Sequence, residues 1–203
     1  MSGLVTKYPD GITRCYWPKQ DQTYIDYHDT EWGVPVTDEN ALFEAIALEG
    51  FQAGLSWITI LKRREGFRKA FLDFEIDRVA KMNEKHVERL MLNESIIRNR
   101  AKIQATIKNA KLIQTLEETL QEIIWSHAPK PSKRTTPAKN FEFQAVSEES
   151  ILLSKTLRSL GFAFVGPTTM YAMMQSIGMI NDHAPGCFRR KPVSYTHLTL
   201  PTK

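Results

Sequence analysis

Apolar residues recur at helical spacing along most of this chain, whereas the strict alternation that indicates a strand is not found in it. Asp38, a favoured N-cap residue, precedes the first strong run and predicts a helix that begins there. Four apolar residues of that run fall on one helical face: Leu42, Phe43, Ile46 and Ala47. The pattern therefore predicts an amphipathic helix early in the chain.

Similar runs follow at intervals. Helices are predicted over residues 58–71, 77–82, 84–92, 95–116, 120–127, 148–160 and 167–177. Ser147 is suited to cap the 148–160 helix, and Pro167 suits the first position of the last one, where a missing N–H costs nothing. Because neither a strand pattern nor an internal repeat is found, the predicted fold class is all-α.

Three stretches lack a helical period. Residues 1–13 are expected to form a loose leader, and residues 129–145, rich in proline and basic side chains, are expected to form a loop. Residues 191–203 follow the point where the fold is complete, and we interpret them as a disordered or foreign tail. His197 lies in that tail and is not counted as a ligand.

The composition is that of an ordinary globular protein, with 42% hydrophobic and 25% charged residues in a chain of 203. A net charge of +4 suits a polyanionic partner. No run of about 18 apolar residues occurs and no secretion signal is recognisable, so we expect no membrane span. We expect a cytoplasmic monomer whose two cysteines are reduced or metal-bound.

One carboxylate stands alone in the apolar stretch LEGFQAGLSWITIL, residues 48–61. Burying Glu49 would cost roughly several kcal/mol unless the side chain were paired or hydrogen-bonded. A fold that keeps it there either uses the charge in a site, or uses the side chain to cap backbone donors in a tight turn between Gly50 and Gly54. The residues alone leave both interpretations open.

Aromatic residues gather around this stretch: Trp17, Tyr24, Tyr27 and Trp57. Such rings most often pack in a core, but they also stack on planar ligands. Beside Glu49 they would form a cage that suits a cationic ring, with π faces for the charge and a carboxylate for a ring N–H.

Two cysteines and two histidines have the spacing of metal half-sites. Twelve residues separate Cys15 from His28, and three separate His183 from Cys187. Together they would give a tetrahedral two-Cys, two-His set, which leaves no position for a catalytic water. The halves lie far apart in the chain, so the alternative of free cysteines and ordinary histidines stays open.

The sequence GFAFVG at residues 161–166 separates two predicted helices. Its two glycines permit a tight hairpin whose backbone amides point outward beside the next helix, an arrangement that binds phosphate regardless of base sequence. Gly161, Val165 and Gly166 are the candidate contacts to a DNA backbone. A plain helix–helix turn is the alternative.

The chain resembles the 3-methyladenine DNA glycosylase I family, which belongs to the helix-hairpin-helix DNA-repair superfamily. The matching segments occur in the family's order and end at Cys187: RCYW, YIDYHDTEWGVP, LEGFQAGLSWITIL, SIIRNRAKIQATIKNA and GFAFVGPTTMYAMMQSIGMINDH. The resemblance implies a helix-hairpin-helix glycosylase fold with one structural zinc per chain.

The implied zinc ligands are Cys15, His28, His183 and Cys187. They would join terminal segments at residues 14–37 and 179–190, around a helical core at 38–178 with its hairpin at 161–166. The resemblance also implies excision of 3-methyladenine from alkylated double-stranded DNA. Glu49 would be the catalytic carboxylate, and the base pocket would be walled by Tyr24, Tyr27, Trp57 and Trp17.

Many members of the superfamily place a catalytic Asp after the hairpin helix, two residues before a His. That position is Asn181 here, and we do not assign its neighbour Asp182 the same role. Methylation at N3 makes adenine a cation and weakens its glycosidic bond, so the base leaves neutral without a strong general acid. Asn181 is compatible with that chemistry.

We therefore expect base flipping, attack of water on the sugar, and no strand cleavage, since no lysine stands where a Schiff base would form. Two other classes remain: a zinc-containing helical module that binds lesions without cutting, and a small-molecule-binding protein. The last would show no salt-dependent affinity for DNA.

Overall fold

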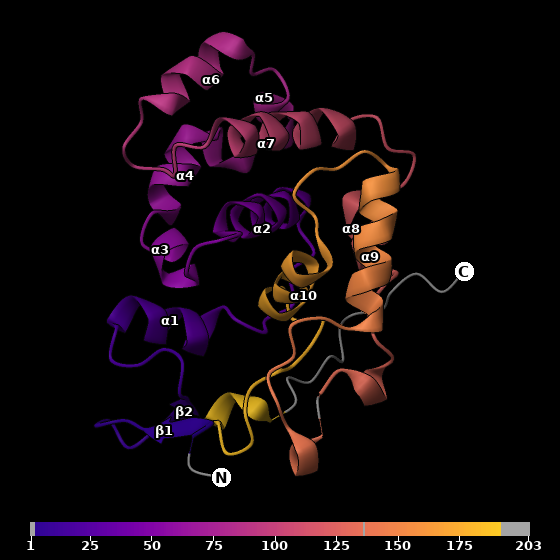
Figure 1. Cartoon of the computed structure of the whole chain (residues 1–203). Helices are drawn as coiled ribbons and strands as arrows, with labels where there is room; N and C mark the ends of the chain where they lie inside the picture. Colours follow the sequence, from indigo (N-terminus) through magenta and orange to yellow (C-terminus); the bar gives the residue numbers. More distant parts are fainter. Residues whose placement is uncertain (1–2, 136, 192–203) are drawn as a thin grey trace.

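The computed structural model describes residues 3–135 and 137–191, and most of this part is helical (Figure 1). The helices are α1 (Gln22–Thr30), α2 (Glu39–Gln52), α3 (Trp57–Leu61), α4 (Arg64–Ala70), α5 (Ile76–Val79), α6 (Glu84–Met91), α7 (Arg100–Ile113), α8 (Leu120–Trp125), α9 (Glu148–Ser159) and α10 (Pro167–Ser176). Short 3-10 turns are η1 (Leu72–Phe74), η2 (Pro131–Lys133), η3 (Ala138–Asn140) and η4 (Phe188–Arg190). The predicted tail from residue 192 on, with His197, lies outside the described residues.

Helix α2 is the centre of the fold (Figure 1). Asp38 caps it as predicted, because its side chain accepts a hydrogen bond of 2.9 Å from the Ala41 N–H. The helix packs against α7, α8 and α10. Every residue from Ile46 to Phe51 is buried, so the second half of α2 is surrounded on all sides.

The other helices follow the predicted runs, with shifted ends. The 58–71 run forms two helices, α3 and α4, and the 95–116 run forms α7, which begins later than predicted. Asn99 sets that start, because its side chain accepts a hydrogen bond of 3.1 Å from the Lys102 N–H. Ser147 and Pro167 occupy the predicted positions at the starts of α9 and α10.

The N-terminal segment differs from the prediction of a loose leader. Strand β1 (Val5–Lys7) pairs antiparallel with β2 (Thr13–Cys15), so that Val5 lies opposite Cys15. Strands of three residues are too short for a period of two to be recognised in the sequence. The all-α class is therefore confirmed for the helical core, with this one small sheet added.

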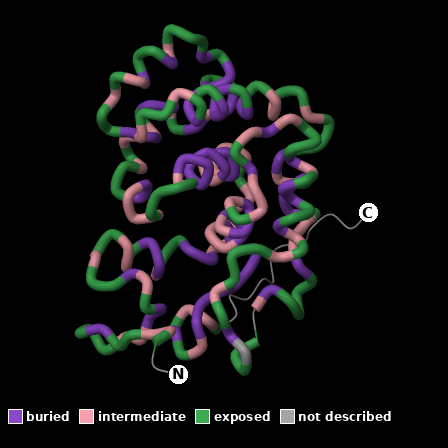
Figure 2. Tube along the Cα trace, viewed as in Figure 1, coloured by how far each residue is buried: buried purple, intermediate pink, exposed green. Residues whose placement is uncertain are grey.

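Buried apolar side chains form two clusters. The larger lies around α2, where Figure 2 shows the densest buried trace. The smaller combines residues from both ends of the chain: Cys15, Tyr27, Trp32, Leu61, Phe141, Ala184 and Cys187. Strand β2 contacts η4, so the N- and C-terminal segments lie side by side at the foot of Figure 1.

The 161–166 segment is a tight connection between α9 and α10. Asn109 of α7 holds it by a pair of hydrogen bonds with Ala163, one from the Asn109 side-chain amide at 3.1 Å and one to its oxygen at 3.0 Å. Gly50 of α2 makes room for the connection, since a Cβ there would lie 3.2 Å from the Phe164 Cβ. The segment is thus fixed to the two helices that enclose the core.

In the described part of the chain, no helix combines the length and apolar character that crossing a membrane requires.

Candidate functional site

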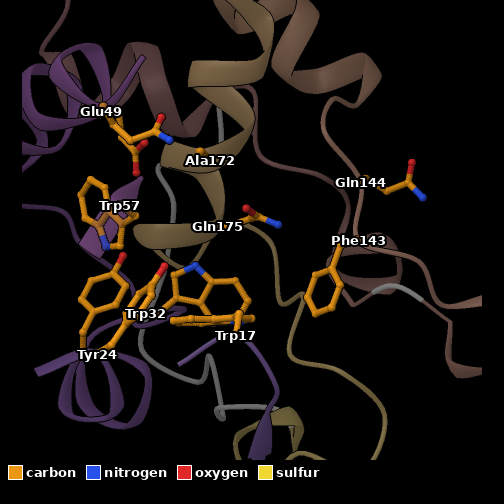
Figure 3. A pocket seen from close by; sticks show the side chains of 11 residues that line it. Trp17, Tyr24, Trp32, Glu49, Trp57, Phe143, Gln144, Ala172 and Gln175 are labelled. Atoms are coloured by element: carbon orange, nitrogen blue, oxygen red, sulfur yellow. The ribbon is translucent and has the colours of Figure 1, made fainter. Parts of the chain in front are cut away.

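A cavity of about 230 Å³ lies where α1, α2, α3 and α10 meet the 129–145 loop (Figure 3). Its lining residues are Trp17, Tyr24, Tyr27, Trp32, Glu49, Gln52, Trp57, Phe143, Gln144, Ala172 and Gln175. The cavity is large enough for one small planar molecule and too small for most drug-sized ligands. All the predicted pocket residues are among those that line it.

Glu49 is the only acid or base in this lining apart from the tyrosine hydroxyls. It is 4% exposed, and burial raises the pKa of its carboxyl group to about 8. Among the described residues, no donor hydrogen-bonds to it and no cation offsets its burial. The alternative of a capping residue in a tight turn is wrong, because Glu49 and Gly50 both lie inside α2.

Aromatic rings form the walls of the cavity. The Trp17 and Tyr24 rings lie 4.7 Å apart between centroids, and the Tyr27 and Trp57 rings lie 5.6 Å apart. Burial and the nearby Glu49 raise the pKa of Tyr24 to about 12 and also raise the pKa of Tyr27 well above its ordinary value, so both hydroxyls keep their protons. The walls are therefore neutral π surfaces beside a single acid.

The indole N–H of Trp57 is buried and, in the described part of the chain, has no hydrogen-bond acceptor. A buried donor without a partner costs roughly 1–3 kcal/mol. Such a group in a pocket wall is a candidate for satisfaction by a ligand or a water.

The four candidate metal ligands lie close together next to the Trp17 and Trp32 rings. These two rings line the cavity and also contact His28 and His183. All four are buried, and their donor atoms lie within 4.8 Å of one another. The Cys187 Sγ lies 3.5 Å from the His28 Nε2 and 3.7 Å from the His183 Nδ1. In a tetrahedral zinc site, with Zn–S of about 2.3 Å and Zn–N of about 2.1 Å, such atoms lie about 3.6 Å apart. The residues fit a metal ion.

Neighbouring groups orient both imidazoles. Asp29 lies 2.7 Å from the His28 Nδ1 and is itself held by two hydrogen bonds from Arg14, at 2.8 and 3.0 Å. The Trp32 carbonyl lies 3.3 Å from the His183 Nε2. Each partner accepts a hydrogen bond from the N–H of one ring nitrogen, and the other nitrogen, which faces the cysteines, can then bind a metal.

Without a metal, the pKa values of the Cys15 and Cys187 thiols shift in opposite directions. Hydrogen bonding to Cys187, together with burial, raises the pKa of Cys15. The same contact with Cys15, and hydrogen bonds from His183 and His28, lower the pKa of Cys187. The pair shares a proton in this arrangement, and a bound metal would release it because thiolates are the ligands.

Known proteins are similar to this chain over most of its length. The model of the methyladenine glycosylase family matches residues 17–190. The chain belongs to the methyladenine glycosylase family. DNA-3-methyladenine glycosylase 1 of Escherichia coli (strain K12) is 48% identical over 182 residues, which cover 87% of this chain and 96% of that relative.

Solved structures of this family agree. A crystal structure of 3-methyladenine DNA glycosylase I, 47% identical, covers 86% of this chain and 98% of its own with a TM-score of 0.81. A structure of 3-methyladenine DNA glycosylase I from Staphylococcus aureus, concerned with 3-methyladenine recognition, is 34% identical with a TM-score of 0.80 and covers 88% and 96%. The resemblance found in the sequence is thereby confirmed.

In this family member, Asn181 lies away from the pocket. It is 4% exposed, its N–H donates to the Arg134 carbonyl at 2.6 Å, and its side-chain oxygen accepts from the His183 N–H at 3.2 Å. Asp182 is also buried and accepts hydrogen bonds from Tyr171 and Gln175. Neither residue is among those that line the cavity.

The 161–166 segment contains the candidate backbone contacts. The Gly161 N–H donates to the Arg158 carbonyl at 2.9 Å, at the end of α9. Within the described residues, the N–H groups of Val165 and Gly166 donate to no protein acceptor. The Val165 side chain is buried, so only its backbone could meet a phosphate.

Six lining residues were not anticipated: Trp32, Gln52, Phe143, Gln144, Ala172 and Gln175. Phe143 and Gln144 belong to the loop for which the sequence indicated no site. Trp32 lies in an aromatic segment and could have been included on that ground. Ala172 and Gln175 both lie on α10, in a run whose apolar period did not indicate a cavity.

Proposed function

We propose that this protein is a DNA repair glycosylase that flips out and hydrolytically excises 3-methyladenine from alkylated double-stranded DNA. The observation that carries the proposal is Glu49, a buried acid without a protein cation in a pocket walled by aromatic rings. Relatives at 46% and 48% identity are named DNA-3-methyladenine glycosylases, and a relative at 34% identity was solved in complex with 3-methyladenine.

The charge state of the base explains selectivity. Normal adenine is neutral, so Glu49 would keep its proton beside this base and gain no charge interaction from it. An N3-methylated adenine carries a positive charge, which favours the ionised form of the Glu49 carboxyl group. The charged ring then lies between π faces such as those of Tyr27 and Trp57. Glu49 then accepts a hydrogen bond from the exocyclic amine or the ring edge of the base.

Cleavage of the glycosidic bond does not require a strong general acid, because the methylated base leaves as a neutral molecule. Water attacks the sugar carbon, and DNA phosphates help to stabilise the oxocarbenium-like state. No lysine is among the lining residues. The buried Lys102 donates instead to the carbonyls of Phe51 and Ala53, at 2.8 and 2.7 Å. These facts support a monofunctional hydrolase that does not cleave the strand.

The backbone of the duplex would be held by the 161–166 connection. The free N–H groups of Val165 and Gly166 lie at the start of α10, where the helix dipole also favours a phosphate. Gly161 supplies the turn that brings them there. Such contacts place the duplex without reading its sequence.

The metal centre is proposed to hold one structural zinc on Cys15, His28, His183 and Cys187. Four protein ligands leave no open position, so the ion would supply stability and no chemistry. It would fasten the terminal segments at 14–37 and 179–190 to each other and thereby position Trp17, which lies 5.2 Å from the His28 ring between centroids. The separate small apolar cluster supports this division from the 38–178 core.

The test is release of free 3-methyladenine from methylated duplex DNA by wild type, Glu49→Gln and Glu44→Gln. Glu44 lies on the same helix but not in the lining, and it pairs with Arg68. We expect release by wild type and Glu44→Gln, and a loss of about 100-fold or more in Glu49→Gln, since a buried charge interaction contributes several kcal/mol.

Full excision by Glu49→Gln would overturn the role given to the carboxylate. Salt-dependent DNA binding without release by wild type would instead indicate a lesion-binding module that has lost activity. Binding of the free base with no affinity for DNA would indicate a small-molecule-binding protein.

A further inference from the structure

Gln175 lines the same pocket as Glu49, and the buried Asp182 accepts a hydrogen bond from its amide nitrogen. It comes from α10, whereas Glu49 comes from α2, so the two helices that pack together each contribute a polar group. In Figure 3 the amide oxygen of Gln175 lies on the side of Glu49 and Trp57, and its nitrogen lies on the far side.

Asp182 determines this orientation. The Gln175 Nε2 donates to the Asp182 Oδ2 at 2.8 Å, and the Tyr171 hydroxyl donates to the same oxygen at 2.5 Å. Burial and this hydrogen bond raise the pKa of Tyr171, so the hydroxyl keeps the proton that it donates. A carboxylate accepts hydrogen bonds only, so the amide nitrogen of Gln175 must face Asp182 and the oxygen must face elsewhere.

The Gln175 amide oxygen has no hydrogen-bond donor in the part of the chain that the structure describes. Within residues 3–135 and 137–191, no donor hydrogen-bonds to the Gln175 Oε1. The Gln175 oxygen is therefore a neutral acceptor in the pocket wall, and the amide cannot reverse while Asp182 holds its nitrogen.

We propose that Gln175 is a specificity residue that accepts a hydrogen bond from the exocyclic amine of the alkylated base, and that Asp182 is its positioning residue. The inference rests on the proposed function and adds to it. N3-methylated adenine and N3-methylated guanine are both cations, so the charge of Glu49 does not separate them. At position 6, however, adenine carries an amine with two donors, whereas guanine carries a carbonyl oxygen that would face the Gln175 oxygen.

The test compares 3-methyladenine with 3-methylguanine for wild type, Gln175→Met, Asp182→Asn and the surface control Gln104→Met. Excision from methylated duplex DNA and equilibrium binding of both free bases are measured. Met matches glutamine in length but has no amide oxygen. We expect the preference for the adenine lesion to fall about tenfold in Gln175→Met, because one acceptor is lost while the walls remain.

The Asp182→Asn variant distinguishes a role in orienting the Gln175 amide from a role in the stability of the fold. Its new side-chain amide can donate to the Gln175 oxygen, which lets the Gln175 amide turn its nitrogen towards the pocket. We expect the ratio between the two bases to fall although Gln175 is intact, whereas loss of stability alone would lower both activities by the same factor. Gln104 is exposed on α7, and Gln104→Met should retain the wild-type ratio.

An unchanged ratio in both Gln175→Met and Asp182→Asn, with wild-type release of 3-methyladenine, would overturn this inference and leave the proposed function standing. If wild type releases neither base, the proposed function fails, and the ratio of free-base affinities still decides the role of Gln175.

Discussion

Glu49 holds a proton near neutral pH as long as the pocket contains no cation, because burial raises its pKa to about 8. Under the proposed function, a cationic base would displace that proton, so that the carboxylate forms only when the opposite charge has arrived. The pocket thus avoids the full cost of a buried bare anion in the free protein. In this proposal the protonated form of Glu49 limits the cost of its burial in the free protein, and the ionised form attracts the bound cation.

This charge state predicts how stability depends on pH. The unfolded chain loses the Glu49 proton near its ordinary pKa of about 4.5, and the folded chain loses it near 8. Between these values the folded state binds one proton more, so its stability falls by roughly 1.4 kcal/mol per pH unit as pH rises. Glu49→Gln removes this dependence and should be the more stable protein, by a few kcal/mol, at pH 9.

Urea denaturation of wild type and Glu49→Gln at several pH values between 5 and 9 measures the difference. Comparing the two proteins cancels the titration of every other group. Glu65→Gln, an exposed change on α4, should run parallel to wild type. A constant difference between wild type and Glu49→Gln over this range would contradict the raised pKa.

At the scale of elements, helices were largely predictable and connections were not. The N-caps Asp38 and Ser147 act through the next few residues, so local sequence contains their whole cause. Phe143 reaches the pocket from a loop whose prolines and basic residues show no period. Its position depends on contacts distant in sequence, such as the pairing of Thr135 with Asn181. Gln175 was missed for a related reason, because the packing of α10 against α2, which are distant in sequence, brings it to the pocket.

Gly178, just after α10, lies against the backbone of residues 33–35, and this close contact predicts the effect of a substitution. Gly178 has a φ of +75°, and a Cβ there would lie 2.6 Å from the Pro35 N and the Val34 carbonyl carbon. The close contact is between backbones, so neither side can move without displacing the segment that leads into α2. Gly178→Ala should destabilise the protein by about 3 kcal/mol or more, combining the strain of a positive φ with overpacking.

Gly11 provides the matched control. Its φ is +82°, but a Cβ would meet nothing within 4 Å. Gly11→Ala should therefore cost only about 1 kcal/mol, from the backbone conformation alone. Chemical denaturation of both variants separates the two terms, and equal losses would show that the contact with the 33–35 segment is unimportant.

At the scale of the whole molecule, the metal centre connects the beginning of the chain to its end. Cys15 and His28 come from β2 and α1, and His183 and Cys187 come from the segment after α10. Around them a small apolar cluster and a few hydrogen bonds hold the terminal segments together. An ion bound at this candidate site would contribute much of the local stability, because the ligands are brought together only in the folded state.

Cys187→Ser should therefore lose metal and stability together. We expect elemental analysis to find one zinc per wild-type chain and less than a tenth of that in Cys187→Ser, with a fall in Tm of roughly 10 °C or more. His86→Gln is the control, since His86 is half-buried on α6, far in sequence from the four ligands, and glutamine can replace it in the capping box that it forms with Asn83. Because Trp17 links the centre to the pocket, Cys187→Ser should also bind 3-methyladenine more weakly, and chelation of wild type should reproduce both losses. Well-folded wild type that contains no zinc, with a Tm that a chelator does not change, would exclude a metal from this site.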